Sequence, residues 1–309
     1  MQLIGISPVW METLELAAKA AQSRARLLLQ GETGTGKDML ARYVHIRGGR
    51  SNVKGGGAAA PFIVLNCAAL SPDLLESELF GHAKGAFTGA SRAHDGLAAA
   101  AHGGTLFLDE IAELAPALQA KLLRFADTGE YRSVGSTQAK RADVRLIAAT
   151  HQPLELRMRE GRFREDLYFR LSVLNITLPP LRARRDDIAP LARHFLALAA
   201  AEEGKNFTAI SPAAETDLSA RAFGGNVREL ENLIRRAVVM HAGPVLEASH
   251  LPAPEQAAAI RIAAVPRPLQ QVQREAIEAA IDYCGGNIPR AAALLEVAPS
   301  TIYRRRDVN

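Results

Sequence analysis

The stretch RLLLQGETGTGKDMLARYVH, Arg26 to His45, decides the fold of this chain. A short apolar run leads into a glycine-rich turn that ends in a lysine, and a helical segment follows. Three glycines let the backbone curl so that successive N–H groups face a phosphate, while the N-terminus of the next helix adds partial positive charge. This order fits the pattern G-x-x-x-x-G-K of a P-loop, so Lys37 is expected to contact the β- and γ-phosphates of a nucleotide.

The predicted nucleotide-binding residues of this turn are consecutive. They are Gly31, Glu32, Thr33, Gly34, Thr35, Gly36, Lys37 and Asp38. Asp38 stands where the general pattern has a serine or threonine hydroxyl for Mg²⁺. We keep its carboxylate as a candidate metal ligand.

A second acidic element, GGTLFLDE at Gly103 to Glu110, is an apolar strand that ends in two carboxylates. Acids at strand ends also occur as simple caps, but a P-loop upstream favours a Walker B element. We expect Asp109 to hold Mg²⁺ and Glu110 to polarise the water that attacks the γ-phosphate. The two elements together predict hydrolysis of a nucleotide with Mg²⁺.

Other apolar, β-rich runs alternate with helical segments, which predicts an α/β fold with a mainly parallel sheet covered by helices. The expected strands are 26–30, 62–66, 105–108, 144–150 and 173–178. After Pro179 the pattern becomes helical and offers no strand. We therefore expect an α/β core at 1–181, a helical domain at 182–251, a Pro- and Ala-rich linker at 252–268 and a last helical unit at 269–309.

Length and composition limit the number of domains, the possible partners and the location of the protein. The chain has 309 residues, enough for two or three domains, and a net charge of +4, which permits a polyanionic partner without requiring one. Its two cysteines, Cys67 and Cys284, have no metal or redox spacing and are expected to be unpaired thiols. The sequence shows no cationic leader followed by an apolar segment and no apolar run that would span a bilayer, so we expect a cytoplasmic protein without a membrane partner.

GAFTGA, Gly85 to Ala90, brackets an apolar Phe87 and a hydroxyl-bearing Thr88 with glycines. A change in the conformation of such a loop tip costs little free energy because glycine tolerates unusual backbone angles. The alternative is a core phenylalanine beside a β-turn. A mobile tip predicts a loop that extends in one nucleotide state and folds away in another.

Six segments, in order, resemble the AAA+ activators of sigma-54 RNA polymerase, the bacterial enhancer-binding proteins. They are NCAAL at 66–70, ELFGHAKGAFTGA at 78–90, FREDLYFRL at 163–171, LPPLRARRDDI at 178–188, GNVREL at 225–230 and the terminal YRRR at 303–306. The resemblance covers essentially the whole chain. It implies an AAA+ P-loop core, a helical lid, a Fis-type helix-turn-helix and a ring that assembles from dimer to hexamer.

The resemblance also assigns roles to single residues. Arg164 and Arg170 match the arginine fingers that reach into a neighbour's nucleotide site, and such arginines are worth roughly 10³ to 10⁵ in rate. Arg228 matches the sensor II position, and Thr150 matches sensor I, although a threonine here could equally cap the next helix. Asn66 matches the switch that restrains the catalytic glutamate, although asparagine at a strand end is often only a turn former. The sigma-54 contact is expected from Gly85, Ala86, Phe87, Thr88, Gly89 and Ala90, with the loop Gly129 to Ser136 in support.

The segment Cys284 to Arg306 reads as helix, turn, helix. Asn287 is expected to cap the first helix with Pro289 in its first turn, and Ala292, Leu294 and Leu295 supply apolar positions. The second helix resembles one that enters the major groove of double-stranded DNA. The expected DNA contacts are Pro299, Ser300, Thr301, Tyr303, Arg304, Arg305 and Arg306. A solvated cationic tail is the alternative.

The leading hypothesis is thus an ATP-driven activator that binds upstream DNA, forms a ring and remodels the sigma-54 RNA polymerase closed complex. Two alternatives stay open: a DNA-binding regulator that uses the ATPase fold as a ligand-gated scaffold, and a AAA+ remodeller unrelated to transcription. The sequence begins at the ATPase core, so we expect either control by a separate regulatory protein or a missing upstream part. Ala83, in place of a commonly acidic residue, and the long loop 48–60 are departures from the family pattern.

Overall fold

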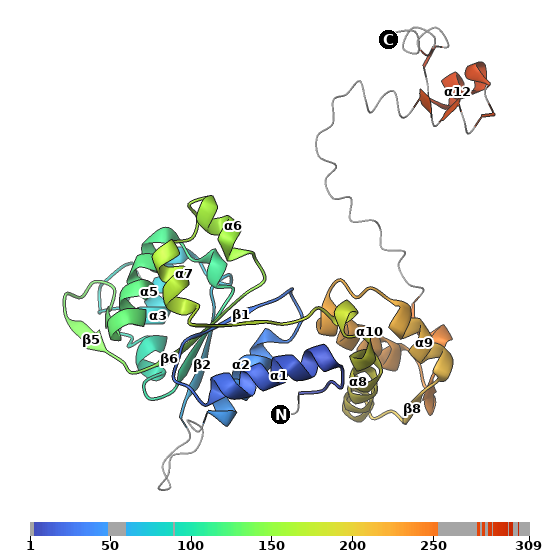
Figure 1. Ribbon diagram of the computed structural model, residues 1–309. Helices are drawn as coiled ribbons and strands as arrows, with labels where there is room; N and C mark the ends of the chain where they lie inside the picture. Colours follow the sequence, from blue (N-terminus) through green and yellow to red (C-terminus); the bar gives the residue numbers. More distant parts are fainter. Residues whose placement is uncertain are drawn as a thin grey trace. The chain divides into compact units, whose positions relative to one another are not determined.

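Figure 1 shows the computed structural model, which divides into two units, Met1–Leu251 and Pro252–Asn309. The structure describes residues 3–48, 60–88 and 90–252, and in the second unit 277, 278, 280, 281, 284, 285, 287–295, 297, 298 and 302. The loop expected at 48–60 therefore lies largely outside the described residues, as do residues 253–268 of the expected linker.

The first unit is built on a five-stranded sheet in the order β2-β3-β6-β1-β7, with every neighbouring pair parallel. Its strands are β1 (Leu27–Gln30), β2 (Phe62–Asn66), β3 (Thr105–Asp109), β6 (Arg145–Thr150) and β7 (Leu174–Thr177). The predicted parallel α/β fold is confirmed. The three inner strands β1, β3 and β6 are buried apolar runs because helices cover both faces, whereas β2 and β7 are edge strands, on which Val64 and Asn175 are exposed.

Alternate residues of each strand enter two separate cores. Leu28, Leu106 and Ala148 pack under one face with α3 (Pro72–Phe80), α5 (Pro116–Thr128) and α7 (Glu165–Leu171). Leu29 and Phe107 pack on the other face with α1 (Pro8–Ala21) and α2 (Lys37–Arg47). Because side chains alternate along a strand, neighbouring leucines serve opposite cores. Figure 1 shows the two helical layers on either side of the sheet.

Shorter elements complete the α/β core. They are α4 (Leu97–Ala100), η1 (Ile111–Glu113), α6 (Leu154–Arg159) and the antiparallel pair β4 (Glu130–Arg132) and β5 (Ala139–Arg141). β4 lies within the segment 129–136, where the sequence predicted only a supporting loop, and β5 follows that segment. These three-residue strands carry too little periodicity to be recognised.

The helical domain follows a pair of single-turn segments, η2 (Leu181–Ala183) and η3 (Arg185–Asp187). Its elements are α8 (Ile188–Glu202), α9 (Pro212–Ala220), α10 (Asn226–Met240) and η4 (Ala248–His250). The expectation of no strand after residue 181 is wrong, because β8 (Ala209–Ile210) and β9 (Val245–Leu246) form a parallel pair. Two-residue strands exist here because the pairing buries Ile210 and Leu246 in the domain core, a long-range effect without a local signal.

In the second unit, α12 (Ile288–Leu294) begins as predicted. The Asn287 side chain accepts a hydrogen bond from the backbone N–H of Arg290 at 3.1 Å, and proline stands in the first turn. The buried face is formed by Ala291 and Ala292, whereas Leu294 is 56% exposed, so its assignment to the apolar face was wrong. Leu295, four positions after Ala291 and three after Ala292, shares their face and is partly buried, whereas Leu294 has no such spacing from Ala292 and is turned towards solvent.

Candidate functional site

The P-loop connects β1 to the first turn of α2, as the sequence predicted. Gly34 has φ +79°, and a Cβ there would lie 2.2 Å from the carbonyl oxygen of Gly225, so only glycine fits. Lys37 is buried and donates from Nζ to the carbonyl oxygens of Gly31 at 2.8 Å and Glu32 at 3.3 Å. Burial lowers the pKa of Lys37. The ammonium group is thus held inside the loop that would surround a phosphate.

Two carboxylates stand at the carboxyl end of β3, beside the lysine. Burial, and next to it the charge of Glu110, raises the pKa of Asp109, while Lys37 opposes the shift. The charges of Glu110, Asp109 and Asp38 all act on Lys37 and raise its pKa against the effect of burial. The predicted acidic groups therefore converge on the P-loop lysine.

The residues present fit a magnesium ion bound together with a nucleotide. Among the described residues no cluster of three or more histidine, cysteine or acidic side chains could hold a metal by itself. Mg²⁺ is usually held by one or two carboxylates together with substrate phosphates and water, which is what Asp109 and Asp38 offer.

His151 is one residue of this site that sequence reasoning missed. Its Nδ1 lies 2.6 Å from Oε2 of Glu110, and its backbone N–H is 3.4 Å from the same oxygen. His151 directly follows β6, the strand next to β3 in the sheet. The carboxyl ends of parallel neighbours meet at one edge, so its position after a buried strand was the available signal.

Thr150 and Asn66 end the two strands that flank β3. The Thr150 side chain accepts a hydrogen bond from the backbone N–H of Gln152 at 3.0 Å, and α6 begins only at Leu154 with Pro153 before it, so Thr150 does not cap that helix. Asn66 lies opposite Asp109 in the β2–β3 register, and its Oδ1 accepts from the N–H of Ala68 at 2.8 Å. Both predicted residues therefore lie at the same sheet edge as the carboxylates.

The lid contributes one wall of a cavity of about 370 Å³ beside the P-loop. Arg228 and Val227, in the first turn of α10, line it together with Gly34, Thr35, Gly36 and Asp38. Arg184, His194 and Glu231 also line it, and much of the remaining wall is apolar: Leu3, Ile4, Leu191, Phe195 and Leu198. Sequence reasoning placed Arg228 here but missed the N-terminal segment and α8. An apolar wall next to a phosphate loop suits the base of a nucleotide.

Asn226 joins this lid to the P-loop. It is fully buried, and its Oδ1 accepts from the N–H of Leu181 at 2.8 Å. Its Nδ2 donates to the carbonyl of Thr33 at 3.0 Å and to the carboxylate of Glu32 at 3.1 Å. Arg182 forms a two-pronged ion pair with the same Glu32 carboxylate, at 2.7 and 2.5 Å. Arg182, and then Asn226, lower the pKa of Glu32 to about 2.

The N-terminal segment is held by the start of the lid. Asp187 accepts from the backbone N–H groups of Ile6 at 2.6 Å and Ser7 at 2.7 Å. Arg184 is buried, donates to the carbonyl of Thr35 at 3.0 Å and lies 4.2 Å above the centre of the Trp10 ring. Burial lowers the pKa of Arg184. P-loop, lid and N-terminal segment are thus linked by buried polar contacts.

Arg164 and Arg170 stand at the two ends of α7 and are half-exposed. Arg164 forms an ion pair with Asp166, with Nη2 and Oδ2 2.7 Å apart, and Arg170 pairs with Asp127. Both predicted finger residues therefore have acidic partners within their own chain.

The GAFTGA segment is described except for Gly89, which lies outside the described residues. Phe87 is 42% exposed, so it is not a core residue, and its ring lies edge-on to His82 with centroids 5.0 Å apart. The base of the loop is joined to the second loop by two backbone hydrogen bonds, Ala83 N–H to Val134 at 2.9 Å and Val134 N–H to Gly81 at 2.8 Å. The apolar tip is therefore presented on a base that the second loop holds.

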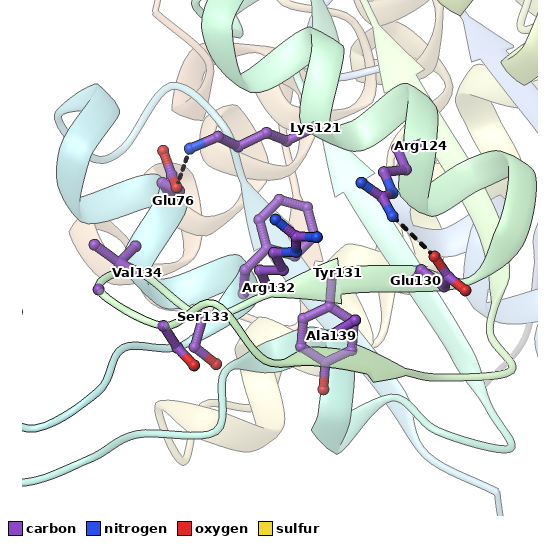
Figure 2. Close-up of a pocket in the computed structure, with 12 residues that line it drawn as sticks. Glu76, Lys121, Arg124, Glu130, Tyr131, Arg132, Ser133, Val134 and Ala139 are labelled. Atoms are coloured by element: carbon purple, nitrogen blue, oxygen red, sulfur yellow. Dashed lines mark hydrogen bonds and ion pairs between the residues drawn. The ribbon is translucent and has the colours of Figure 1, made fainter.

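A cavity of about 410 Å³ lies between this second loop, α3 and α5. Figure 2 shows its rim, where Lys121 pairs with Glu76 and Arg124 with Glu130, the latter at 3.0 Å. The second loop therefore borders open space on its helix side.

The second unit carries the expected DNA-binding residues, but 299–301 and 303–306 lie outside the described residues. Those contacts stay predictions. Among the described residues no helix is both long and apolar enough to cross a membrane.

The parallel sheet, the P-loop and the helical lid define a P-loop nucleotide-binding protein of the AAA+ class. Three family profiles match the chain in succession: a Sigma-54 interaction domain at 3–177, a AAA+ ATPase lid domain at 182–265 and a Bacterial regulatory protein of the Fis family at 268–307. The chain belongs to the family of sigma-54-dependent transcription regulators with a Fis-type DNA-binding domain.

Individual relatives agree with this family. The chain is 44% identical to the regulatory protein LuxO of Vibrio cholerae over 315 aligned positions, 98% of this chain and 68% of that protein. It is 48% identical to the regulatory protein AtoC of Escherichia coli over 246 positions, which cover 80% of this chain and 52% of AtoC. The structure of NtrX from Brucella abortus in complex with ATP matches with a TM-score of 0.72 and 32% identity, over 99% of this chain and 68% of that one.

Proposed function

We propose that this chain hydrolyses ATP and uses the reaction to remodel the sigma-54 RNA polymerase closed complex, so that open complexes form at promoters whose upstream DNA it binds. The observation that carries the proposal is the convergence of Lys37, Asp109 and Glu110 at one sheet edge, in a chain that also presents an exposed Phe87 in GAFTGA. The nucleotide complex of the related NtrX supports ATP as the ligand.

Each proposed role follows from the chemistry of the residue. Gly31 to Gly36 present backbone N–H groups to the phosphates. The ammonium group of Lys37 exchanges its hydrogen bonds to backbone carbonyls for contacts with the phosphate oxygens. Asp109 and Asp38 would hold Mg²⁺, which would supply positive charge to the phosphates. Glu110 accepts the proton of the attacking water, while Thr150 and Arg228 contact the nucleotide from β6 and the lid.

Catalysis requires a neighbouring subunit in this proposal. Arg164 and Arg170 exchange their partners Asp166 and Asp127 for the phosphates of the adjacent nucleotide in a ring. The GAFTGA loop contacts sigma-54 with Phe87, and the Fis-type domain binds double-stranded DNA through residues 299–306. The domain boundaries near residues 181, 251 and 268 separate these tasks.

The test measures ATP turnover and open-complex formation at a sigma-54 promoter with the same preparations. Glu110→Gln should bind ATP but hydrolyse it about 10² to 10⁴-fold more slowly, which is the contribution of a general base. Phe87→Ala should keep ATP turnover and lose open-complex formation, with Met240→Ala, which removes an exposed apolar side chain at the end of α10, as a control that keeps both. Normal activation by Phe87→Ala would refute the role of the loop.

A further inference from the structure

In the part of the chain that the structure describes, His151 holds the carboxylate of Glu110 through two contacts to the same oxygen. Nδ1 of the ring is 2.6 Å from Oε2, and the backbone N–H is 3.4 Å from it. An ionised carboxylate only accepts hydrogen bonds, so the ring nitrogen that faces it is the one that carries hydrogen. Both contacts use Oε2, so neither of them engages Oε1.

His151 is itself fixed in place. The hydroxyl of Thr150 accepts from the N–H of Gln152, and the Gln152 side chain donates to Glu113 and accepts from Nε of Arg157 at 2.6 Å. These contacts anchor the residues on both sides of His151 at the end of β6. The imidazole ring of His151 is therefore attached to a backbone that is anchored on both sides.

The held conformation of Glu110 keeps its charge in the phosphate site. Glu110 has φ +55°, which is uncommon for a residue with a side chain and persists only where the surroundings impose it. Of the three carboxylates that raise the pKa of Lys37, Glu110 has the largest effect, ahead of Asp109 and Asp38. The contact with His151 thus does not withdraw the carboxylate from the P-loop lysine.

We propose that His151 is a positioning residue for Glu110: by fixing Oε2 it aims Oε1 at the water that attacks the nucleotide. A general base is most effective when a third group fixes its orientation, and here His151 is that group. The inference rests on the ATPase activity proposed above. It differs from the family-based role of Asn66, whose Oδ1 is engaged with Ala68.

The test compares three substitutions at this position in the full chain. His151→Ala should lower the turnover number for ATP about 10 to 100-fold, the range expected when a reacting group is misplaced by about 1 Å. The dissociation constant for a fluorescent ADP analogue should stay within about twofold, because His151 contacts the Glu110 carboxylate and not the P-loop backbone. His151→Asn places its amide nitrogen where Nδ1 stands and should restore most of the rate, whereas His151→Gln places it one bond further and should not.

The control is His102→Ala, which removes an exposed histidine whose Nδ1 contacts the N–H of Asp143 at the opposite end of β3. It should keep wild-type turnover. Unchanged or faster turnover in His151→Ala, or equal rescue by Asn and Gln, would overturn the positioning role. A wild-type chain without ATP turnover would instead refute the proposed function, and the inference would then fail with it.

A measurement on the nucleotide-free protein tests the contact itself. Histidine ¹⁵N NMR should show His151 as the neutral form with hydrogen on Nδ1 or as the doubly protonated ring, and Glu110→Ala should shift its Nδ1 resonance. A ring with hydrogen only on Nε2, or a resonance unmoved by Glu110→Ala, would contradict the geometry on which the proposal stands.

Discussion

Replacing Asn226 by alanine should destabilise the first unit by about 3–5 kcal/mol, because this one side chain joins the P-loop to the start of the lid. The N–H of Leu181 loses its acceptor at a fully buried position, which costs about 1–3 kcal/mol. The bond to the carbonyl of Thr33 contributes about 1 kcal/mol net, since water reaches that exposed loop when the side chain is removed. Asn226 also has φ +56°, where alanine is less stable by about a further 1 kcal/mol.

Two matched variants separate these contributions. Asn226→Gly loses the same hydrogen bonds without the backbone strain, so it should be about 1 kcal/mol more stable than the alanine variant. Asn226→Asp keeps an acceptor for the N–H of Leu181 but places a second carboxylate beside Glu32. Its stability should fall between wild type and alanine and improve with added salt, since salt screens the repulsion.

Urea unfolding followed by fluorescence of the single tryptophan, Trp10, is the appropriate assay. Trp10 packs under Arg184 at the start of the lid, so its emission reports on this part of the first unit. The free energy of unfolding is extrapolated from the linear dependence on urea, with the slope m compared among variants. A loss below about 1 kcal/mol for Asn226→Ala, or equal stability of the alanine and glycine variants, would refute the reasoning.

Three further predictions address other parts of the first unit. Gly135→Ala should impair sigma-54-dependent activation but not ATP turnover, because a Cβ at φ +74° would lie 2.8 Å from Cβ of Ala86 and displace the GAFTGA loop; equal activation would contradict this. The ion pair of Glu32 and Arg182 should stabilise the folded chain above the ordinary carboxyl pKa of 4.5 and stop doing so as pH falls towards about 2, where the folded-state carboxylate is protonated. Because the pair is half-exposed, the loss should be only about 1 kcal/mol in acid unfolding, and Arg182→Ala should abolish it. Burial raises the pKa of Cys67 to about 12, so its thiol should not react with a thiol reagent at pH 8 until the chain unfolds; mass spectrometry of the labelled native protein would show the opposite if this is wrong.

The sequence predicted the central sheet because its evidence is local. Each buried strand is an apolar run of the correct length, and the P-loop and the two carboxylates each follow such a run directly. The residues Lys37, Asp109 and Glu110 could therefore be placed at one edge from topology alone. The β8–β9 pair could not be predicted, since its two-residue strands exist only because distant segments bury Ile210 and Leu246 together.

The parts of the site that the sequence did not reveal all depend on long-range contacts. His151 reaches Glu110 from a neighbouring strand, and Leu3 and Ile4 reach the cavity because Asp187 holds the N-terminal segment. Neither contact can be recognised from a sequence motif, because a single histidine or leucine occurs in many structural settings. Asn226 did fall within a recognised motif, but its buried role emerged only from its hydrogen bonds to Leu181 and Thr33.

The ion pairs of Arg164 and Arg170 bear on how the proposed ring could form. Each arginine is half-exposed and already paired within its chain, and exposed pairs of this kind contribute only about 0–1 kcal/mol. Exchanging Asp166 or Asp127 for a neighbour's carboxylate would therefore gain little. A bound triphosphate offers much more charge and several acceptor oxygens, so the exchange becomes favourable only when the neighbouring P-loop is loaded. In the proposed ring, the pairs within the chain would thus make nucleotide occupancy, rather than subunit contact alone, the condition for Arg164 and Arg170 to enter the neighbouring site.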